Sequence, residues 1–300
     1  MNVEKIKFNN ILIFARKKRE NIIKVLQDLE KILHDYGYSA HFESKTEEIF
    51  KAHIQNSCNN LDLNKIDLVI VVGGDGTILQ ATKIAVENDI PLLGINCGRI
   101  GFLSDLRSND VDSLINILNG EYTEEKRFML SCDLVNSKGS SFIGNALNEV
   151  ALMRGNLVKI IEFDIYINNK FVCNQRADGL LVSTPTGSTA YSLSAGGPIV
   201  QPCLETISLV PMCAHTLNTR PIVIAPDNLI SIKTKQRHSC PPNISYDGND
   251  KISINEGSYI NISKAKQHLR LIHPRNYHYF ETLKNKLHWE RKPYAEFSAD

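Results

Sequence analysis

The sequence lacks any long apolar segment and any paired cysteine motif. No run approaches the roughly 20 apolar residues that span a bilayer, and the first residues contain no apolar segment long enough for a signal peptide. The seven cysteines are odd in number, scattered and free of any CxxC pair, which argues against a disulfide framework or a zinc ribbon. We therefore expect a soluble, cytoplasmic protein in a reducing compartment, with no membrane partner.

An excess of one charge is also missing. The 34 lysines and arginines are matched by 33 aspartates and glutamates, so the net charge is +1 and no nucleic-acid partner is expected. The short basic cluster Arg16–Arg19 is interpreted as a solvated face. With 300 residues, 42% of them hydrophobic, the chain is long enough for one large domain or two ordinary ones with a substantial core.

Several signatures of enzyme chemistry are absent too. There is no GxxxxGK[ST] sequence, no GxSxG elbow, and no HExxH or other metal-ligand spacing among the nine histidines. The glycine run that begins at Gly73 does not complete GxGxxG, because Leu79 holds the place of the third glycine. A P-loop ATPase, an ordinary Rossmann dehydrogenase, a hydrolase and a protein-built metal site are therefore disfavoured.

The first part of the chain alternates between strand-like and helix-like patterns. This alternation predicts a Rossmann-like α/β domain with a mainly parallel sheet over residues 1–125. Asp67–Val72 is apolar almost throughout, as a central parallel strand should be, and the apolar residues from Asn21 to Leu33 recur at helical spacing before Gly37. The expected strands are 11–14, 40–42, 67–72 and 90–95, the expected helices are 21–33 and 78–87, and the polar stretch through residue 60 is expected to be a loop.

After about residue 125 short alternating runs dominate. Turn signals such as Asn168-Asn169 and Asp247–Asp250 separate them, which indicates antiparallel hairpins or meanders. We predict a β-rich, β-sandwich-like domain over residues 126–272, and a C-terminal tail over residues 273–300 that packs back on the first domain. The fold class is therefore α/β plus all-β.

A glycine-rich loop follows the clearest strand. Gly73-Gly74-Asp75-Gly76-Thr77 lies where a parallel strand leads into a helix, which is where open α/β sheets bind ligands. The glycines allow the backbone to approach phosphate oxygens closely. An aspartate among phosphates suggests a role in taking a proton from a hydroxyl or in holding Mg²⁺ through water, and the alternative is an aspartate that only fixes its own turn.

The stretch from Asp178 to Pro198 joins a short apolar run to a dense series of small and hydroxylated residues. Thr186, Ser188 and Thr189 are candidates to cap a helix that opens at Ala190. The start of a helix suits anionic ligands, and small side chains let a ligand lie against the backbone. The alternative is a Ser/Thr-rich loop that only reverses the chain.

Two short polar pairs complete the candidate residues. The amide and carboxylate of Asn148-Glu149 offer donors and acceptors that suit a ribose or an adenine edge, although such a dipeptide also occurs in ordinary turns. Arg176 precedes Asp178 by two residues, and the pair is either a ligand contact or an exposed surface pair.

These pieces together resemble the NAD kinases, in particular the bacterial form. The resemblance extends over nearly the whole chain in the family's order, and its most specific part is the long stretch from Asp178 to Pro198. The matching segments are Gly73–Thr77, Gly94–Leu103, Asn148-Glu149, Asp178–Pro198, Leu271–Pro274 and Tyr279-Phe280. It implies transfer of the γ-phosphoryl group of ATP, or of inorganic polyphosphate in some bacterial members, to the 2′-hydroxyl of the adenosine ribose of NAD, giving NADP.

The resemblance also implies roles for single residues. Asp75 is the proton acceptor and lies against NAD with Gly76, while Gly73, Gly74, Gly76 and Thr77 form the phosphate loop. Asn148 and Glu149 contact the adenosine part, and Asp178 binds the nicotinamide side with Arg176 close by. Lys159 falls where members of the family vary, and its charge suits a phosphate. Asn249 stands where the family often has the longer Gln. The residues that line the dinucleotide are Thr189, Ala190, Tyr191, Ser192, Leu193 and Ser194.

The family further implies a site between the two domains, Mg²⁺ bound with ATP, and a homodimer or homotetramer whose neighbouring subunits help to complete the NAD site. Two other functions remain open at this point. A GGDG-loop kinase for a lipid or sugar would have no need for the stretch from Asp178 to Pro198, and a non-catalytic dinucleotide sensor would have no need for the carboxylate of Asp75. Formation of NADP from NAD and Mg-ATP distinguishes the three.

Overall fold

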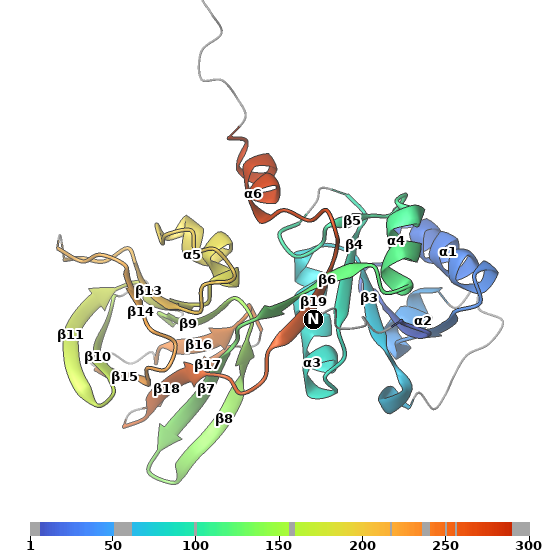
Figure 1. Ribbon diagram of the computed structural model, residues 1–300. Helices are drawn as coiled ribbons and strands as arrows, with labels where there is room; N and C mark the ends of the chain where they lie inside the picture. Colours follow the sequence, from blue (N-terminus) through green and yellow to red (C-terminus); the bar gives the residue numbers. More distant parts are fainter. Residues whose placement is uncertain are drawn as a thin grey trace, which may run out of the picture. The chain divides into compact units, whose positions relative to one another are not determined.

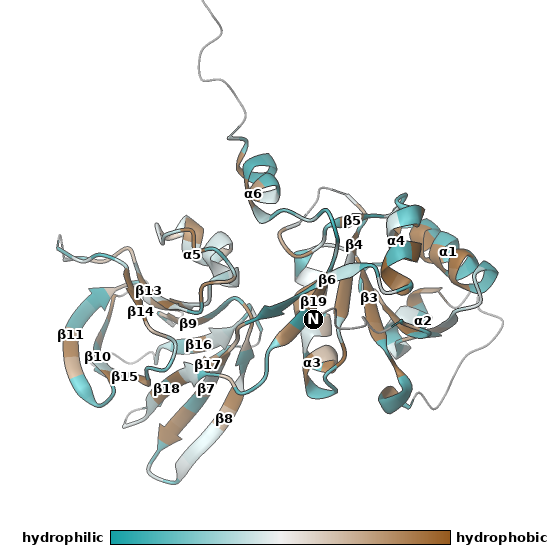
Figure 2. Cartoon of the chain, viewed as in Figure 1, coloured by the Kyte–Doolittle hydropathy of each residue, from teal (hydrophilic) through white to brown (hydrophobic). Residues whose placement is uncertain are grey.

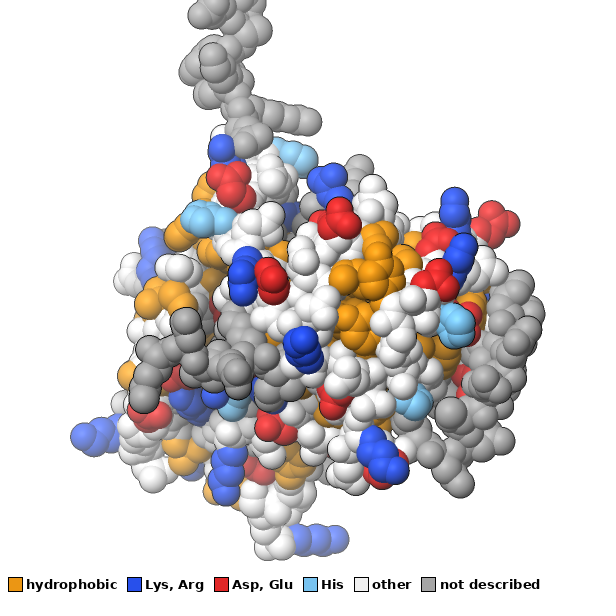
Figure 3. Space-filling model, turned by 45° about the vertical axis from the view of Figure 1, so that its right-hand side comes forward, with side chains coloured by type: hydrophobic (Ala, Val, Ile, Leu, Met, Phe, Trp, Pro, Cys, Tyr) orange, Lys and Arg blue, Asp and Glu red, His pale blue; other side chains and the backbone are white. Residues whose placement is uncertain are grey.

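The computed structural model describes residues 7–50, 62–98, 101–155, 160–216, 218–235, 241–249, 251–255 and 257–289. Contacts divide the chain into two units: one runs through Glu125 and resumes at Leu269, and the other is Lys126–His268. No helix within the described ranges combines the length and apolar character that crossing a membrane requires. On the face shown in Figure 3, lysine and arginine side chains are interspersed with aspartate and glutamate.

The first unit is built on a seven-stranded sheet in the order β2-β1-β3-β4-β19-β6, with β5 paired to β4. The strands are β1 (Asn10–Phe14), β2 (Ser39–Phe42), β3 (Leu68–Val72), β4 (Leu92–Asn96), β5 (Leu106–Arg107), β6 (Tyr122–Arg127) and β19 (Leu269–Pro274). Strands β1 to β4 pair in parallel, and every residue of β3 and β4 is buried. The brown colour of β3 in Figure 2 reflects this apolar run, and the predicted α/β architecture is confirmed.

Helices cover this sheet on both faces. The helices of this unit are α1 (Glu20–Asp35), α2 (Ser44–Phe50), η1 (Leu63–Lys65), α3 (Asp75–Glu87), α4 (Val111–Leu118) and α6 (Tyr279–Leu287). Figure 1 shows α1 and α4 on one side of the sheet and α3 on the other. In α1 the buried residues Ile22, Leu26, Leu29 and Leu33 follow the predicted helical spacing. Gly37, at φ 80°, follows the end of this helix in the left-handed region, as expected.

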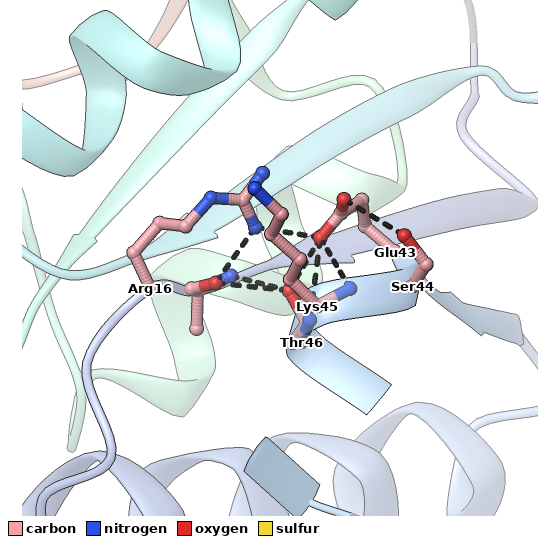
Figure 4. Close-up of polar contacts among 6 residues, drawn as sticks. Arg16, Glu43, Ser44, Lys45 and Thr46 are labelled. Atoms are coloured by element: carbon pink, nitrogen blue, oxygen red, sulfur yellow. Dashed lines mark hydrogen bonds and ion pairs between the residues drawn. The ribbon is translucent and has the colours of Figure 1, made fainter. Parts of the chain in front are cut away.

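Helix α2 corrects the expectation of a loop through residue 60. Figure 4 shows Glu43 at its start, where the carboxylate accepts the N–H groups of Lys45 and Thr46 and pairs with Arg16 at 2.6 Å. Thr46 in turn bonds to the backbone of Ala15, so the end of β1 holds the first turn in place. Partial burial favours a raised pKa for Glu43, but the contact with Arg16 and the N–H of Thr46 outweigh it, and the pKa lies below its usual value. Residues 51–60 lie outside the described residues.

Strand β19 belongs to the first sheet, where Leu271 lies beside Leu92 of β4 in parallel. The sequence predicts a second domain over residues 126–272, which includes most of β19. An alternating run identifies a strand but not the sheet that it joins, because both sheets offer the same kind of apolar face. The strand is followed by helix α6.

The second unit consists of two six-stranded sheets in the orders β11-β10-β15-β18-β7-β8 and β14-β13-β12-β9-β16-β17. Their bounds are β7 (Leu130–Asn136), β8 (Gly139–Ala146), β9 (Glu149–Met153), β10 (Ile161–Ile167), β11 (Lys170–Ala177), β12 (Gly179–Ser183), β13 (Ile207–Met212), β14 (Ile222–Ile224), β15 (Ile230–Lys235), β16 (Asn243–Tyr246), β17 (Ile252–Ser253) and β18 (Tyr259–Lys264). Buried residues of both sheets, among them Phe163 and Leu180, form one shared cluster. The predicted antiparallel, sandwich-like domain is confirmed.

Candidate active site

The glycine loop lies at the carboxyl end of β3, in the interior of the first sheet. Helix α3 begins at Asp75, three residues earlier than the sequence predicted, and Gly74 is its N-cap residue without any side-chain cap. A Cβ atom at Gly73 would lie 2.5 Å from the hydroxyl oxygen of Thr77, so only glycine fits there. Gly74 and Gly76 are exposed. The loop therefore presents unobstructed backbone at the edge of the sheet where α/β proteins bind ligands.

Asp75 is half-buried, and a second loop holds its carboxylate. Oδ2 accepts the N–H of Phe102 at 2.9 Å, and Oδ1 accepts the N–H of Leu103 at 3.2 Å. Both donors belong to the segment that follows β4. Both hydrogen bonds thus join Asp75 to a different loop, and neither closes a turn within the glycine loop itself. This geometry disfavours the alternative in which Asp75 only fixes its local backbone.

In the second unit, Asn148 lies between β8 and β9, Glu149 is the first residue of β9, and Asp247 holds both. The Asp247 carboxylate accepts three consecutive backbone N–H groups, those of Leu147 at 2.6 Å, Asn148 at 2.7 Å and Glu149 at 3.1 Å. Asp247 sits in the turn after β16 with φ at 48°. The sequence predicted the turn but not this role, because a carboxylate that binds backbone N–H groups a hundred residues away leaves no sequence pattern.

Glu149 and Asp247 form a pair of buried carboxyl groups. Burial raises the pKa of Glu149 to about 7, and the nearby charge of Asp247 contributes in the same direction. Burial also raises the pKa of Asp247 to about 6, against the opposing effect of its three backbone donors. Within the part of the chain that the structure describes, the Oε2 atom of Glu149 is buried without a hydrogen-bond partner. A buried carboxyl oxygen without a partner is available to a ligand that brings its own donor or acceptor.

The stretch after β12 differs from the expected capped helix. It forms a short 3₁₀ helix, η2 (Thr186–Thr189), and a single turn, α5 (Tyr191–Ser194), whose N-cap Ala190 has no side-chain cap. The Ser188 hydroxyl instead bonds to an earlier residue and to a later one. It donates to the carbonyl of Pro185 at 2.6 Å and accepts the N–H of Val200 at 3.0 Å. The capping prediction is therefore wrong, because the turn is too tight for these side chains to reach forward.

This stretch packs against Asn148. The N–H of Thr184 donates to the carbonyl of Asn148 at 2.9 Å, and a Cβ atom at Gly187 would lie 2.5 Å from the carbonyl carbon of Asn148. The Asn249 N–H closes the neighbouring turn onto Tyr246 at 2.9 Å. The structure thus brings Asn148 close to Thr184 and Gly187, which precede the predicted 189–194 segment, and Asp247 holds Asn148 and Glu149 beside the turn that carries Asn249.

Asp178 has a partner that the sequence did not indicate. Its carboxylate pairs with Arg154 at 3.4 Å, and the backbone N–H of Arg154 donates to the carbonyl of Asp178 at 3.0 Å. The antiparallel pairing of β9 with β12 places the two residues together. Arg176 is exposed on β11, where it lies opposite Glu162 of β10, and its carbonyl accepts the N–H of His215. Lys159 lies outside the described residues.

Within the described ranges, no group of three or more His, Cys, Asp or Glu side chains is arranged to hold a metal ion. The carboxylate within the glycine loop, that of Asp75, accepts two N–H groups.

Comparisons with known proteins show which family the chain resembles. The model of the ATP-NAD kinase N-terminal domain matches residues 11–122, and that of the ATP-NAD kinase C-terminal domain matches residues 147–274. The chain is 44% identical to an NAD kinase of Coxiella burnetii over 296 residues, covering 97% of each chain. It is 41% identical to an NAD kinase of Legionella pneumophila over 300 residues, covering 96% of this chain and 99% of the relative.

Two solved structures share the fold. A yeast NADH kinase complexed with NADH superposes with a TM-score of 0.85 at 24% identity, over 96% of this chain and 90% of that one. An NAD kinase from Archaeoglobus fulgidus in complex with ATP superposes with a TM-score of 0.71 at 24% identity, over 93% of this chain and 98% of that one.

Proposed function

The chain belongs to the NAD kinase family and catalyses the ATP-dependent phosphorylation of NAD, and we propose that Asp75 is the general base of this reaction. The carboxylate takes the proton of the 2′-hydroxyl of the adenosine ribose as that oxygen attacks the γ-phosphorus of ATP. The bond from the γ-phosphorus to the bridging oxygen of the β-phosphate breaks, which gives NADP and releases ADP. The observation that carries the proposal is the position of a half-buried, doubly hydrogen-bonded aspartate in the glycine loop at the carboxyl end of β3. A positioned carboxylate contributes about 10²–10⁴ to the rate of such a proton transfer.

The phosphate loop has a separate task in this proposal. Phosphoryl transfer depends mainly on positioning and charge neutralisation, and the exposed backbone at Gly74 and Gly76 supports a role in receiving phosphate oxygens. Gly73 and Thr77 shape the loop through their close contact. Mg²⁺ enters as Mg-ATP, and its charge offsets the repulsion between the phosphates and Asp75.

The residues of the second unit recognise the dinucleotide. We assign Asn148 and Glu149 to the adenosine part, and the buried Oε2 of Glu149 supports this because it has no hydrogen-bond partner among the described residues. Asp178 takes the nicotinamide side with Arg176 nearby. The remaining assigned NAD contacts are Gly76, Lys159, Thr189, Ala190, Tyr191, Ser192, Leu193, Ser194 and Asn249.

The proposal also covers assembly and compartment. By analogy with the family, the chain is a homodimer or homotetramer, which light scattering on the purified protein measures directly. The scattered cysteines support a reducing, cytoplasmic location. Replacing ATP with inorganic polyphosphate in the assay shows whether the second donor is accepted.

The Asp75→Asn variant tests the general base. We expect it to bind NAD with near wild-type affinity in calorimetry while the rate of NADP formation from NAD and Mg-ATP falls about 10²–10⁴-fold. Asp112→Asn, an exposed acidic residue in the first turn of α4, is the matched control and should leave the rate unchanged. A near wild-type rate in Asp75→Asn would show that another group accepts the proton. NAD binding without any NADP formation by the wild-type chain would favour the sensor function.

A further inference from the structure

We infer that the segment Gly101–Ser104 is a positioning element for the Asp75 carboxylate, and that Gly101 must lack a side chain so that the carboxylate can occupy its working position. The inference rests on the proposed role of Asp75 as the base. It assigns a function to a segment that includes none of the proposed catalytic or NAD-binding residues.

The first observation is the pair of backbone donors. Phe102 and Leu103 donate their N–H groups to different oxygens of Asp75, at 2.9 and 3.2 Å. Two bonds to two oxygens fix the plane of the carboxylate as well as its position, which a single bond could not do. Each carboxylate oxygen can accept a second hydrogen bond, so a ribose hydroxyl can approach while both backbone bonds stay in place.

The second observation is the lack of space at Gly101. A Cβ atom there would lie 2.7 Å from Cγ of Asp75 and closer still to Oδ1, and it would also lie 2.7 Å from Oγ of Ser104. All of these are side-chain atoms, so the backbone can keep its path when a methyl group is added. The Asp75 carboxylate would have to turn away, and the Ser104 hydroxyl would have to give way as well. An alanine at position 101 therefore changes the orientation of the base and leaves the fold in place.

The third observation is that the segment is anchored from behind. The hydroxyl of Ser104 accepts the N–H of Gly101 at 3.3 Å and the side-chain amide of Asn96 at 3.0 Å, and both Ser104 and Asn96 are buried. Asn96 ends β4, so these bonds tie the segment to the sheet. Gly94 allows the close approach, because a Cβ atom there would lie 2.9 Å from the carbonyl oxygen of Leu103.

The Gly101→Ala variant tests the inference, with Gly98→Ala as its matched control in the same loop. Among the described atoms, the nearest to a Cβ at Gly98 is the side-chain oxygen of Asn96 at 4.0 Å. We expect Gly101→Ala to lower kcat by about 10–100-fold while the KM for NAD changes by less than about threefold, since misplacing a reacting group by ~1 Å can cost 10²-fold. The melting temperature and the activity of Gly98→Ala should match the wild type.

Hydrogen exchange supplies a readout that does not depend on turnover. The amides of Phe102 and Leu103 should be protected in the wild type and exchange faster in both Gly101→Ala and Asp75→Ala. Ser104→Ala loosens the anchor without adding any atom, and we expect a smaller fall in kcat with the same faster exchange.

The outcomes separate the inference from the function on which it rests. A folded Gly101→Ala variant with wild-type kcat overturns the inference. If Gly101→Ala does not fold, wild-type kcat and exchange in Ser104→Ala overturn it instead. An active Asp75→Asn variant refutes the general base itself, whereas an inactive Asp75→Asn beside a fully active Gly101→Ala refutes only the positioning role.

Discussion

At the scale of single residues, the buried carboxyl pair Glu149 and Asp247 connects stability to pH. Both groups have raised pKa values, Glu149 to about 7 and Asp247 to about 6, with burial as the main cause. A carboxyl whose folded-state pKa lies above its unfolded value binds more protons in the folded state. The free energy of unfolding therefore falls as the pH rises from about 4 to about 7 through these groups.

Glu149→Gln should remove its share of this pH dependence. At pH 5 the wild-type side chain is protonated and the variant should be about equally stable. At pH 8 the wild type carries a buried charge, and the variant should gain about 1–3 kcal/mol relative to it, since one pKa unit corresponds to about 1.4 kcal/mol. Urea unfolding at the two pH values measures the difference. If the variant and the wild type differed in free energy of unfolding by the same amount at pH 5 and pH 8, Glu149 would not titrate between these pH values.

Residue identity alone revealed only part of the candidate site. The glycine loop with Asp75 was predictable because its residues are contiguous and directly follow an apolar strand. The partners of that site were not: Phe102 and Leu103 contribute backbone N–H groups, which every residue except proline possesses. Arg154 was missed for a similar reason, since only the pairing of β9 with β12 brings it to Asp178.

At the scale of elements, periodicity predicted those helices and strands that bury one continuous face. Helix α1 and strand β3 are of this kind. Helix α2 was missed because residues outside the helix stabilise it. The Glu43 carboxylate, which pairs with Arg16, accepts an N–H group of its first turn. The ring of Phe50 stacks on that of Phe42, with the ring centroids 5.2 Å apart. Such contacts are tertiary, so a local pattern does not reveal them.

The contact between η2 and the β8–β9 connection gives a prediction at this scale. An alanine at Gly187 would place Cβ 2.5–2.8 Å from the carbonyl carbon and Cα of Asn148, which are backbone atoms and cannot rotate away. The Asn148-Glu149 connection must then shift, at a cost of about 1–3 kcal/mol. Gly187→Ala should raise the KM for NAD by roughly tenfold, because 1.4 kcal/mol corresponds to a factor of ten.

Steady-state kinetics with varied NAD measures this effect, and Gly98→Ala again supplies a glycine replacement without a close contact. An unchanged KM for NAD in a folded Gly187→Ala variant would contradict the assignment of Asn148 and Glu149 to the adenosine part.

At the scale of the whole molecule, the first unit is formed by two separate parts of the sequence, with the second unit inserted between them. Residues through Glu125 and those from Leu269 onward form one unit, and the residues between them form the other. Near residue 125 the sequence changes from alternating strand-like and helix-like patterns to short alternating runs. This change predicts a domain boundary near the point where the chain leaves the first unit. The return at β19 was not predictable, because the pairing of Leu271 with Leu92 joins segments from opposite ends of the sequence.

Two isoleucine replacements test whether the cores are separate. Ile272 of β19 is buried in the cluster of the first unit, and Ile262 of β18 is buried in that of the second. Each change to alanine should destabilise its own unit by about 2–5 kcal/mol. Hydrogen exchange should accelerate in β1, β3 and β4 for Ile272→Ala, and in β7, β15 and β18 for Ile262→Ala. In the sequence, Ile272 comes after the whole second unit and lies far from β1. Faster exchange in β1 would therefore result from contact in space and not from proximity along the chain. Equal acceleration in both units by either variant would show a single cooperative core.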